Sequence, residues 1–394
     1  MLKRSGGHLR TAVLLASKNL DDWSTKALTE PLPGGVLPYG LQHLAASFRL
    51  TWSTTHQQGL WRTRLPRIAG GVIRRRAPGL QGALISCCST SRLAAADVAV
   101  SVFEDAGLGF ARWQALSPRM SRSFPPHVMI ACWLAEDSQH MTPTQLTSIR
   151  RSIQSISKLV VFSANQIPIL ANSLGISPES ISVIPFGVDT QYYSPSAVDG
   201  PAGGGGVVAV GGDSRRDYAT LMAAARMASL PITLVCFPRN ISRLDLPPQV
   251  KVCYDLRHDE YRRLLLAADL VVTPTIAPAY PSGQSVVLEA MSMGRATLTT
   301  DSPAMREYVA DGVDGALVRP RDPAHMAELI SDLLADDDRR QSLGTTAAKT
   351  VRASFGLQHM WQNVATVLNA ASAERQSPQP CQPSGDTPQQ LTPS

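Results

Sequence analysis

Short apolar runs recur along the first half of the chain, with polar and mixed segments between them. The runs lie at residues 11–16, 98–103, 128–133, 159–162 and 181–184. Continuous apolar runs of this length are typical of strands that are buried on both faces of a parallel sheet. Helix-like segments such as 40–48 and 143–156 separate them. This alternation predicts an α/β fold with helices on both faces of the sheet.

A glycine-rich stretch at residues 199–206 (DGPAGGGG) interrupts the pattern and predicts a linker. A second series follows, with strand-like runs at 207–210, 232–237, 270–273 and 296–299 and helix-like segments at 218–228, 258–268 and 285–293. Two such series predict two Rossmann-like, doubly wound domains that face each other across a ligand-binding cleft. We expect an N-terminal domain over 1–198, a C-terminal domain over 207–355, a helix over 356–371 that returns to the N-terminal domain, and a disordered tail over 372–394.

The composition fits two buried cores, since 44% of the 394 residues are hydrophobic. The net charge of +6 suits a phosphate-bearing ligand, an anionic membrane surface or a nucleic acid, and does not choose among them. No apolar run reaches the ~20 residues of a membrane span, and the run at 11–16 is too short for a signal-peptide core. The six cysteines have no CxxC spacing, which is typical of a reducing compartment. We therefore expect a cytoplasmic protein.

The loop and helix at residues 280–295 (YPSGQSVVLEAMSMGR) carry the most specific chemistry. Turn-forming residues at 281–285 lead into a helix that Gly294 is expected to end. Backbone N–H groups at a helix start lack partners within the helix, and with the helix dipole they form a site for a diphosphate. Glu289, one turn into the helix, is placed to accept both hydroxyl groups of a ribose. An ordinary loop with a solvent-facing Glu289 stays open as the alternative.

This segment resembles the donor-binding region of retaining glycosyltransferase family 4, whose members have the GT-B fold. The residues that match the family pattern are Glu289, Ala290, Met291, Gly294, Thr300, Asp301, Glu307, Gly312 and Gly315. The resemblance implies a nucleotide-sugar donor, held by Glu289, Ser282, Gly283, Gln284, Ser285 and Val286. The chain departs from the family at Pro281, where members have a glutamate that positions the donor sugar. This departure leaves the identity of the sugar open.

A basic pair near the start of the second domain extends the resemblance. Gly211 and Gly212 precede Arg215 and Arg216, where family members have an arginine and a lysine that grip the donor diphosphate. Arg216 aligns with that lysine, and Gly212 stands at the position of that arginine. Arg215 is expected to supply the second charge, because arginine suits bidentate contact with phosphate. Both arginines are predicted catalytic residues; the alternative is a solvated helix start.

The first domain resembles the family less closely. Gly34 and Gly35 resemble a glycine loop that faces the donor phosphates across the cleft. No histidine stands at the strand end where family members often carry one. Glu136 is predicted as a catalytic residue that contacts the acceptor or a leaving proton, and the acidic side chains expected to contact the acceptor are Glu104, Asp105 and Asp137. Each of these could instead be a loop acid in water.

Together these features predict an enzyme that moves a hexose or N-acetylhexosamine from a UDP-sugar to an acceptor hydroxyl with retention. The acidic loops favour a soluble, cationic acceptor such as an aminoglycoside core, which would place the enzyme in antibiotic biosynthesis. The eight histidines show no metal-ligand spacing, so neither a metal nor another cofactor is expected.

Two other interpretations stay open. The basic segment 61–76 (WRTRLPRIAGGVIRRR) has interleaved apolar residues, which would suit a peripheral membrane enzyme that acts on a lipid or cell-envelope acceptor. The proline at position 281 would also suit a non-catalytic protein that binds nucleotide sugars. Nucleic-acid binding is not expected, because the basic residues form no stripe with aromatic ones.

Overall fold

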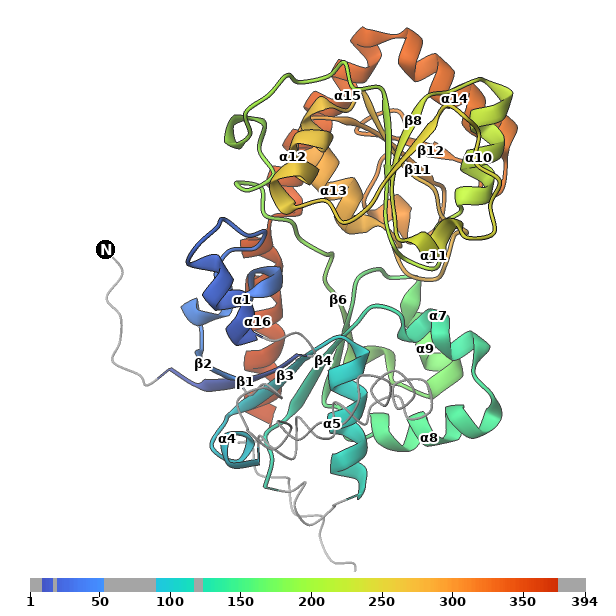
Figure 1. Ribbon diagram of the computed structural model, residues 1–394. Helices are drawn as coiled ribbons and strands as arrows, with labels where there is room; N and C mark the ends of the chain where they lie inside the picture. Colours follow the sequence, from blue (N-terminus) through green and yellow to red (C-terminus); the bar gives the residue numbers. More distant parts are fainter. Residues whose placement is uncertain (1–8, 17–19, 53–89, 117–122, 375–394) are drawn as a thin grey trace, which may run out of the picture.

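The structure is a computed structural model that describes residues 9–16, 20–52, 90–116 and 123–374. It contains two six-stranded sheets, one in each domain, and every pairing between strands is parallel (Figure 1). The N-terminal sheet has the order β2 (Arg49–Trp52), β1 (Thr11–Ala16), β3 (Val98–Val102), β4 (His127–Ala131), β5 (Lys158–Val161), β6 (Ile181–Val183). The C-terminal sheet has the order β12 (Ala316–Val318), β11 (Ala296–Thr300), β10 (Leu270–Thr273), β7 (Val207–Val210), β8 (Ile232–Val235), β9 (Val250–Cys253).

Helices cover both faces of the N-terminal sheet because successive strand residues point to opposite sides. Leu14 and Val100 pack with α1 (Leu20–Ala27), the 3-10 helix η1 (Pro38–Ala46) and the C-terminal helix α16 (Leu357–Glu374). Their neighbours Val13 and Ala99 face the opposite layer. That layer consists of α4 (Thr90–Ala94), α5 (Glu104–Leu116), α7 (Leu134–His140), α8 (Pro143–Ile153) and α9 (Gln166–Leu174), with the short helix η3 (Pro178–Ser180) after it.

The C-terminal sheet is covered in the same way. One layer consists of α10 (Tyr218–Met227), α11 (Pro238–Ile241) and α14 (Pro323–Ala335). The other consists of α12 (His258–Ala267), α13 (Gln284–Ser292), η5 (Met305–Glu307) and α15 (Asp337–Ser354). Figure 1 shows α12, α13 and α15 together on one side of this sheet, with α10 and α14 on the other. Both domains are therefore doubly wound.

All nine predicted strands occur within two residues of their expected positions. Three further strands, β2, β9 and β12, did not stand out in the hydrophobic pattern, and each of them lies at the edge of its sheet. Edge strands are partly exposed, so β2 (RLTW) and β9 (VKVC) alternate polar and apolar residues instead of forming an apolar run. The helix expected over 40–48 is a kinked 3-10 helix, because Tyr39 and Gly40 have positive φ.

The chain passes between the domains at two points that lie side by side. The N–H of Val188 donates to the carbonyl of Phe355 at 2.8 Å, and the N–H of Leu357 donates to the carbonyl of Val188 at 3.0 Å. From Val188 onward, Tyr192 and Tyr193 pack in the core of the C-terminal domain. The 3-10 helix η4 (Pro195–Ala197) follows them. The hinge therefore lies at Val188 and Gly356, and α16 returns to the N-terminal core.

The glycine-rich stretch 199–206 does not link the domains, contrary to the prediction. The N–H groups of Gly204 and Gly206 donate to the carboxylate of Asp269, at 2.7 and 2.8 Å. These contacts hold the stretch against the C-terminal domain, where it forms the entry to β7. The first crossing comes earlier, because Val188, Tyr192 and Tyr193 already belong to the second core.

Two predicted features concern residues outside the described ranges. The basic segment 61–76 lies wholly outside them, and so does the tail from residue 375 onward. Residues 372–374, which were expected in the tail, form the last turn of α16, and Ser372 is buried there. Among the described helices, none combines the length and the apolar character that crossing a bilayer requires.

Candidate functional site

A cavity of about 540 Å³ lies between the two domains. The N-terminal domain contributes Trp23, Gly34 and Tyr39 to its lining. The C-terminal domain contributes the residues that follow β7, β8 and β9, together with the first turns of α13. The volume is in the range of small-molecule sites, and its position at the carboxyl ends of parallel strands is where ligands bind in open α/β folds.

The first turn of α13 faces this cavity with unsatisfied backbone groups. Gly283 begins the helix in the left-handed region, at φ 89°, and the carbonyl of Pro281 accepts the N–H of Gln284 at 3.0 Å. Among the described residues, none accepts a hydrogen bond from the N–H of Ser285 or Val286. Both residues line the cavity. The helix start therefore offers two N–H donors and the positive end of the helix dipole to an anion.

Arg216 lies beside this helix start, between two glycines. A Cβ atom at Gly211 would stand 2.1 Å from Nε of Arg216, and one at Gly283 would stand 2.2 Å from its Nη1. These same two nitrogen atoms are buried and have no hydrogen-bond partner. Two buried guanidinium nitrogens without partners are unfavourable unless a ligand completes their hydrogen bonds. Arg216 lies beside Gly283, where α13 begins, and a guanidinium there suits the oxygen atoms of a phosphate or diphosphate.

Glu289 lies one turn further along α13 and lines the same cavity. Its Oε2 accepts a hydrogen bond from the hydroxyl of Tyr261 at 2.5 Å, and Tyr193 also interacts with the carboxyl group. Burial raises the pKa of Glu289 to about 7, although the two tyrosines oppose the shift. The carboxylate is thus oriented by two aromatic hydroxyls, with an edge left for hydroxyl groups of a ligand.

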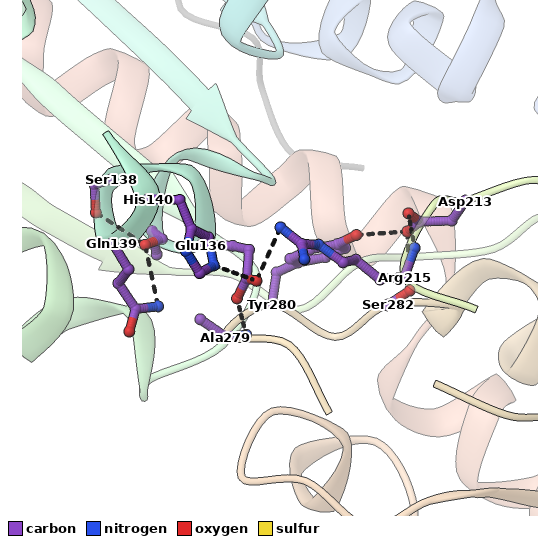
Figure 2. A network of polar contacts seen from close by, with 10 residues as sticks. Glu136, Ser138, Gln139, His140, Asp213, Arg215, Ala279, Tyr280 and Ser282 are labelled. Carbon is purple, nitrogen blue, oxygen red and sulfur yellow. Dashed lines mark hydrogen bonds and ion pairs between the residues drawn. The ribbon is translucent and has the colours of Figure 1, made fainter. Parts of the chain in front are cut away.

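The carboxylate of Asp213 lies against the loop where Pro281 departs from the family pattern. Its Oδ2 accepts hydrogen bonds from the hydroxyls of Tyr280 and Ser282, at 2.6 and 2.9 Å (Figure 2). The hydroxyl of Ser282, which was predicted to hold a sugar hydroxyl, is therefore bonded to Asp213. Gln284, another predicted donor residue, has its side chain beside the thiol of Cys132 in the N-terminal domain.

Gly34 and Gly35 both have positive φ and form a turn at the cavity wall. The N–H of Gly34 donates to Asp189 at 3.2 Å, and the side chain of Gln42 donates to the carbonyl of Gly34. Gly212 also lines the cavity, and a Cβ atom there would stand 2.2 Å from the ring of Phe237. An arginine at position 212 would displace this ring, so the family's side chain has no room in this conformation.

Glu136 joins the two domains and is not a free catalytic acid. Its Oε1 pairs with Nη2 of Arg215 at 3.2 Å, and its Oε2 accepts the N–H of Ala279 at 2.9 Å (Figure 2). His140, one turn along α7, lies 3.3 Å from Oε1. One carboxylate of the N-terminal domain thus holds both Arg215 and Ala279 of the C-terminal domain. Arg215, predicted to grip the diphosphate, is directed toward this interface instead.

Glu104, predicted to contact the acceptor, is buried at the end of β4, where its Oε2 has no hydrogen-bond partner among the described residues. Its Oε1 accepts three backbone N–H groups, from Cys132, Trp133 and Leu134, at 2.6 to 2.8 Å. The side chain is buried and fixes the end of β4 to the start of α5. Asp105 is exposed in the first turn of α5, so it lies on a helix and not on the expected loop.

Asp137 is exposed in the first turn of α7. Desolvation raises its pKa, and the nearby charge of Arg215 opposes that shift. Two of the four predicted acidic residues, Asp105 and Asp137, are exposed, and Asp137 is the one that lies beside the domain interface. Among the described residues, no group of three His, Cys, Asp or Glu side chains is arranged to hold a metal ion.

The sequence pattern missed Asp213 and Tyr261. Asp213 comes three residues before Arg216 in the loop after a strand, and that position was a usable signal. Tyr261 reaches Glu289 from α12, and nothing in the sequence links the two residues. The hydrogen bond between them depends on how α12 and α13 pack.

Comparison with known proteins finds a family match in the C-terminal domain. Residues 208–336 match the family described as glycosyl transferases group 1. D-inositol 3-phosphate glycosyltransferase of Corynebacterium urealyticum is 31% identical over 133 residues, which cover 34% of this chain and 30% of that protein. Glycogen synthase of Mycobacterium tuberculosis is 33% identical over 130 residues, or 32% of this chain and 30% of that protein. The matched segment thus spans less than a third of each relative.

Solved structures are similar over nearly the whole chain. HepE of Anabaena, solved in complex with UDP, superposes with a TM-score of 0.64 at 16% identity, over 91% of this chain and 100% of HepE. Sucrose-phosphate synthase from Thermosynechococcus elongatus gives a TM-score of 0.68 at 17% identity, over 93% and 100% of the two chains. These likenesses confirm the predicted GT-B fold. The sequence relatives are named as glycosyltransferases and synthases, in agreement with the predicted class of enzyme.

Proposed function

We propose that this chain transfers a hexosyl or N-acetylhexosaminyl group from a UDP-sugar to a hydroxyl group of an acceptor, with retention of the anomeric configuration. The observation that carries the proposal is Arg216, whose Nε and Nη1 are buried without partners beside the open helix start of α13. This arrangement supports a diphosphate site, and the match to glycosyl transferases group 1 spans all of these residues. HepE, which has the same fold, binds UDP.

In this proposal the donor lies along the cavity with its diphosphate between Arg216 and the N–H groups of Ser285 and Val286. The ribose hydroxyls donate to Glu289. The base then reaches the part of the cavity lined by Leu256 and His258. A UDP-sized ligand suits the volume of about 540 Å³.

The chemistry breaks the bond between the anomeric carbon and the diphosphate oxygen, and the diphosphate keeps the electron pair. The acceptor oxygen forms a new bond to the anomeric carbon on the same face, and its proton passes to the departing diphosphate. Arg216 and the α13 dipole stabilise the negative charge that develops there. We propose that these protein groups take the place of a metal ion. Retention is proposed from the resemblance to the retaining family.

The acceptor is proposed to approach from the N-terminal domain, beside Asp137. The aminoglycoside-type acceptor was inferred from four acidic side chains, of which Glu104 and Glu136 have their carboxylates engaged within the protein. The basis for a cationic acceptor is therefore reduced to Asp105 and Asp137. We also propose a cytoplasmic location, because the described cysteines are unpaired.

Thermal unfolding in the presence of nucleotides tests this function. UDP is expected to raise the melting temperature, and the stabilisation reaches roughly 3 kcal/mol when UDP is at 100 times its Kd. Arg216→Ala and Glu289→Ala should abolish most of the shift. Arg352→Ala, at an exposed position of α15, is the matched control and should keep it. ADP and GDP serve as comparators for the base.

The outcomes separate the candidate functions. No shift with any nucleoside diphosphate would contradict the proposal. A shift with UDP, but neither hydrolysis nor transfer of the sugar from any UDP-hexose, would identify a non-catalytic nucleotide-sugar-binding protein. The anomeric configuration of a product, read from the coupling constant of its anomeric proton, tests retention.

A further inference from the structure

Aromatic side chains gather at the carboxyl edge of the N-terminal sheet, although they make up only 6% of the chain. The residues are Tyr39 on η1, Phe103 after β3, Trp133 after β4, Phe162 after β5 and Phe186 after β6. Their rings form a continuous series. The ring centroid of Phe103 lies 5.3 Å from those of Tyr39 and Trp133 and 6.5 Å from that of Phe162. The centroids of Phe162 and Phe186 are 5.5 Å apart. We name Tyr39, Phe103, Trp133 and Phe186 the aromatic wall, with Phe162 behind it.

Packing of the core does not account for the whole wall. Phe162 is 3% exposed and belongs to the core, but Trp133 is 39% exposed. The other three rings are half-buried at the rim of the same core. Large apolar side chains that gather at a partly exposed edge are typical of a surface that binds a ligand.

The backbone is held in an unfavourable conformation at two positions of the wall. Tyr39 has φ 59° and Phe103 has φ 68°, both in the left-handed region that bulky side chains avoid. Such residues persist where the surrounding structure holds them, and they cluster at functional sites. Glu104, the residue after Phe103, also holds the backbone of Trp133, because its carboxylate accepts the N–H of Trp133 at 2.6 Å. The rings of Phe103 and Trp133 are thereby held with their planes tilted by 50°.

The wall is continuous with the proposed donor site. Tyr39 and Phe186 line the same cavity as Ser285 and Glu289. At the other end, Cys132, the residue before Trp133, contacts Gln284 at the start of α13. A molecule that stacks on the wall would thus lie next to the position proposed for the donor diphosphate.

We propose that the acceptor is a molecule with a planar aromatic ring and a ring hydroxyl group, which stacks on the aromatic wall. This inference rests on the proposed function and names its acceptor class. Stacked and edge-to-face rings attract one another beyond the area they bury. Of the carboxylates expected to select a cationic acceptor, Glu136 pairs with Arg215, and Glu104 accepts three backbone N–H groups through its Oε1.

Binding of 4-methylumbelliferone, a planar phenol, to the full chain saturated with UDP tests the inference by calorimetry. The wild type should bind it, and Trp133→Ala should weaken binding about tenfold or more. Trp133→Phe keeps a ring and should stay within about threefold of the wild type, whereas Trp133→Leu keeps only bulk and should resemble Trp133→Ala. Met227→Ala, at a side chain that is 61% exposed on α10, is the control and should bind like the wild type.

The UDP-induced shift in melting temperature is measured on every variant, and Trp133→Ala should keep it. No UDP shift in the wild type would mean that the proposed function itself fails. A normal UDP shift with no binding of the phenol, or with equal binding by Trp133→Ala, would overturn this inference alone. Preferential binding of a cationic aminocyclitol or of methyl glucoside would also overturn it.

Discussion

Single residues set the geometry of the proposed diphosphate site. The guanidinium of Arg216 fits between Gly211 and Gly283 because neither glycine has a side chain. Gly283 also begins α13 at φ 89°, so it serves the helix start and the arginine together. A glycine is therefore required at position 283 for two separate physical reasons.

Gly283→Ala separates these two reasons when it is compared with Gly294→Ala. Both glycines have positive φ, so each substitution should cost about 1 kcal/mol of stability. Only at 283 would the new Cβ meet Arg216, at 2.2 Å; at 294 the nearest atom is 3.9 Å away. We expect UDP affinity, measured by calorimetry, to fall at least about tenfold in Gly283→Ala alone. Equal affinities in the two variants would contradict the role of Arg216.

Glu289 gives the site a dependence on pH. Burial raises its pKa to about 7, so the group is increasingly protonated as the pH falls below 7. If the carboxylate accepts ribose hydroxyls, UDP affinity in the wild type should be about tenfold lower at pH 6 than at pH 8. The glutamine in Glu289→Gln cannot ionise, so position 289 should then cause no difference in UDP affinity between pH 6 and pH 8. A flat profile in the wild type would exclude the proposed contact.

The stability of the folded protein should change with pH in the opposite direction to the UDP affinity. Between about pH 4.5 and pH 7 the folded protein binds a proton at Glu289 that the unfolded chain has released. The stability contributed by the protonated group is therefore lost as the pH rises through 7. Relative to Glu289→Gln, the wild type should lose about 1–3 kcal/mol between pH 5 and pH 9, measured by denaturant unfolding.

Among the elements, α16 shows how the end of the chain completes the first domain. It begins just after the hinge at Gly356 and packs against η1 and the N-terminal sheet. Trp361 is 1% exposed there, and its Nε1 donates to the carbonyl of Tyr39 at 2.6 Å. The helix thus supports the turn that carries one ring of the aromatic wall.

Trp361→Ala should destabilise the protein by about 3–5 kcal/mol, because it leaves a large cavity and an unsatisfied carbonyl. Denaturant unfolding followed by circular dichroism measures the change. His359→Ala is the matched control on the same helix, at an exposed position, and should leave stability within about 0.5 kcal/mol of the wild type. A small effect of Trp361→Ala would show that α16 is dispensable for the first domain.

In the whole molecule, the two domains are joined by polar contacts on one side of the cleft. The hydroxyl of Tyr308 donates to the carbonyl of Phe162 at 2.7 Å, and Glu307 accepts the N–H of Ala164 at 2.7 Å. The ion pair between Glu136 and Arg215 adds to them. The hinge consists of two adjacent segments of the chain, so opening of the cleft is expected.

Glu136→Gln should favour the open arrangement, because it removes a charge from an ion pair in which Glu136 is 7% exposed. Small-angle X-ray scattering without ligand should then give a larger radius of gyration than the wild type, and saturating UDP should reduce the difference. Glu30→Gln breaks the exposed Lys26–Glu30 pair and is the control. An unchanged radius in Glu136→Gln would mean that this ion pair does not hold the cleft.

The order of elements and much of the candidate donor site could be predicted from the sequence. Buried strands produce apolar runs, so both sheets were found. The edge strands β2 and β9 were missed because they are partly exposed and mix polar with apolar residues, and β12 was missed because it has only three residues. The turn at 281–285, the helix after it and Gly294 as its end follow from local backbone chemistry. The sequence by itself thus determined the parallel α/β architecture and the α13 segment.

The tertiary structure decided which polar side chains remain available to a ligand. Glu104 and Glu136 look alike in sequence, yet one caps a strand end and the other joins two domains. Arg215 and Arg216 are adjacent, yet one faces the interface and the other is enclosed by glycines. Such differences depend on contacts between residues far apart in the chain, and local propensity carries no information about those contacts. The aromatic wall formed in the same way, because parallel strands bring their carboxyl ends to one edge of the sheet.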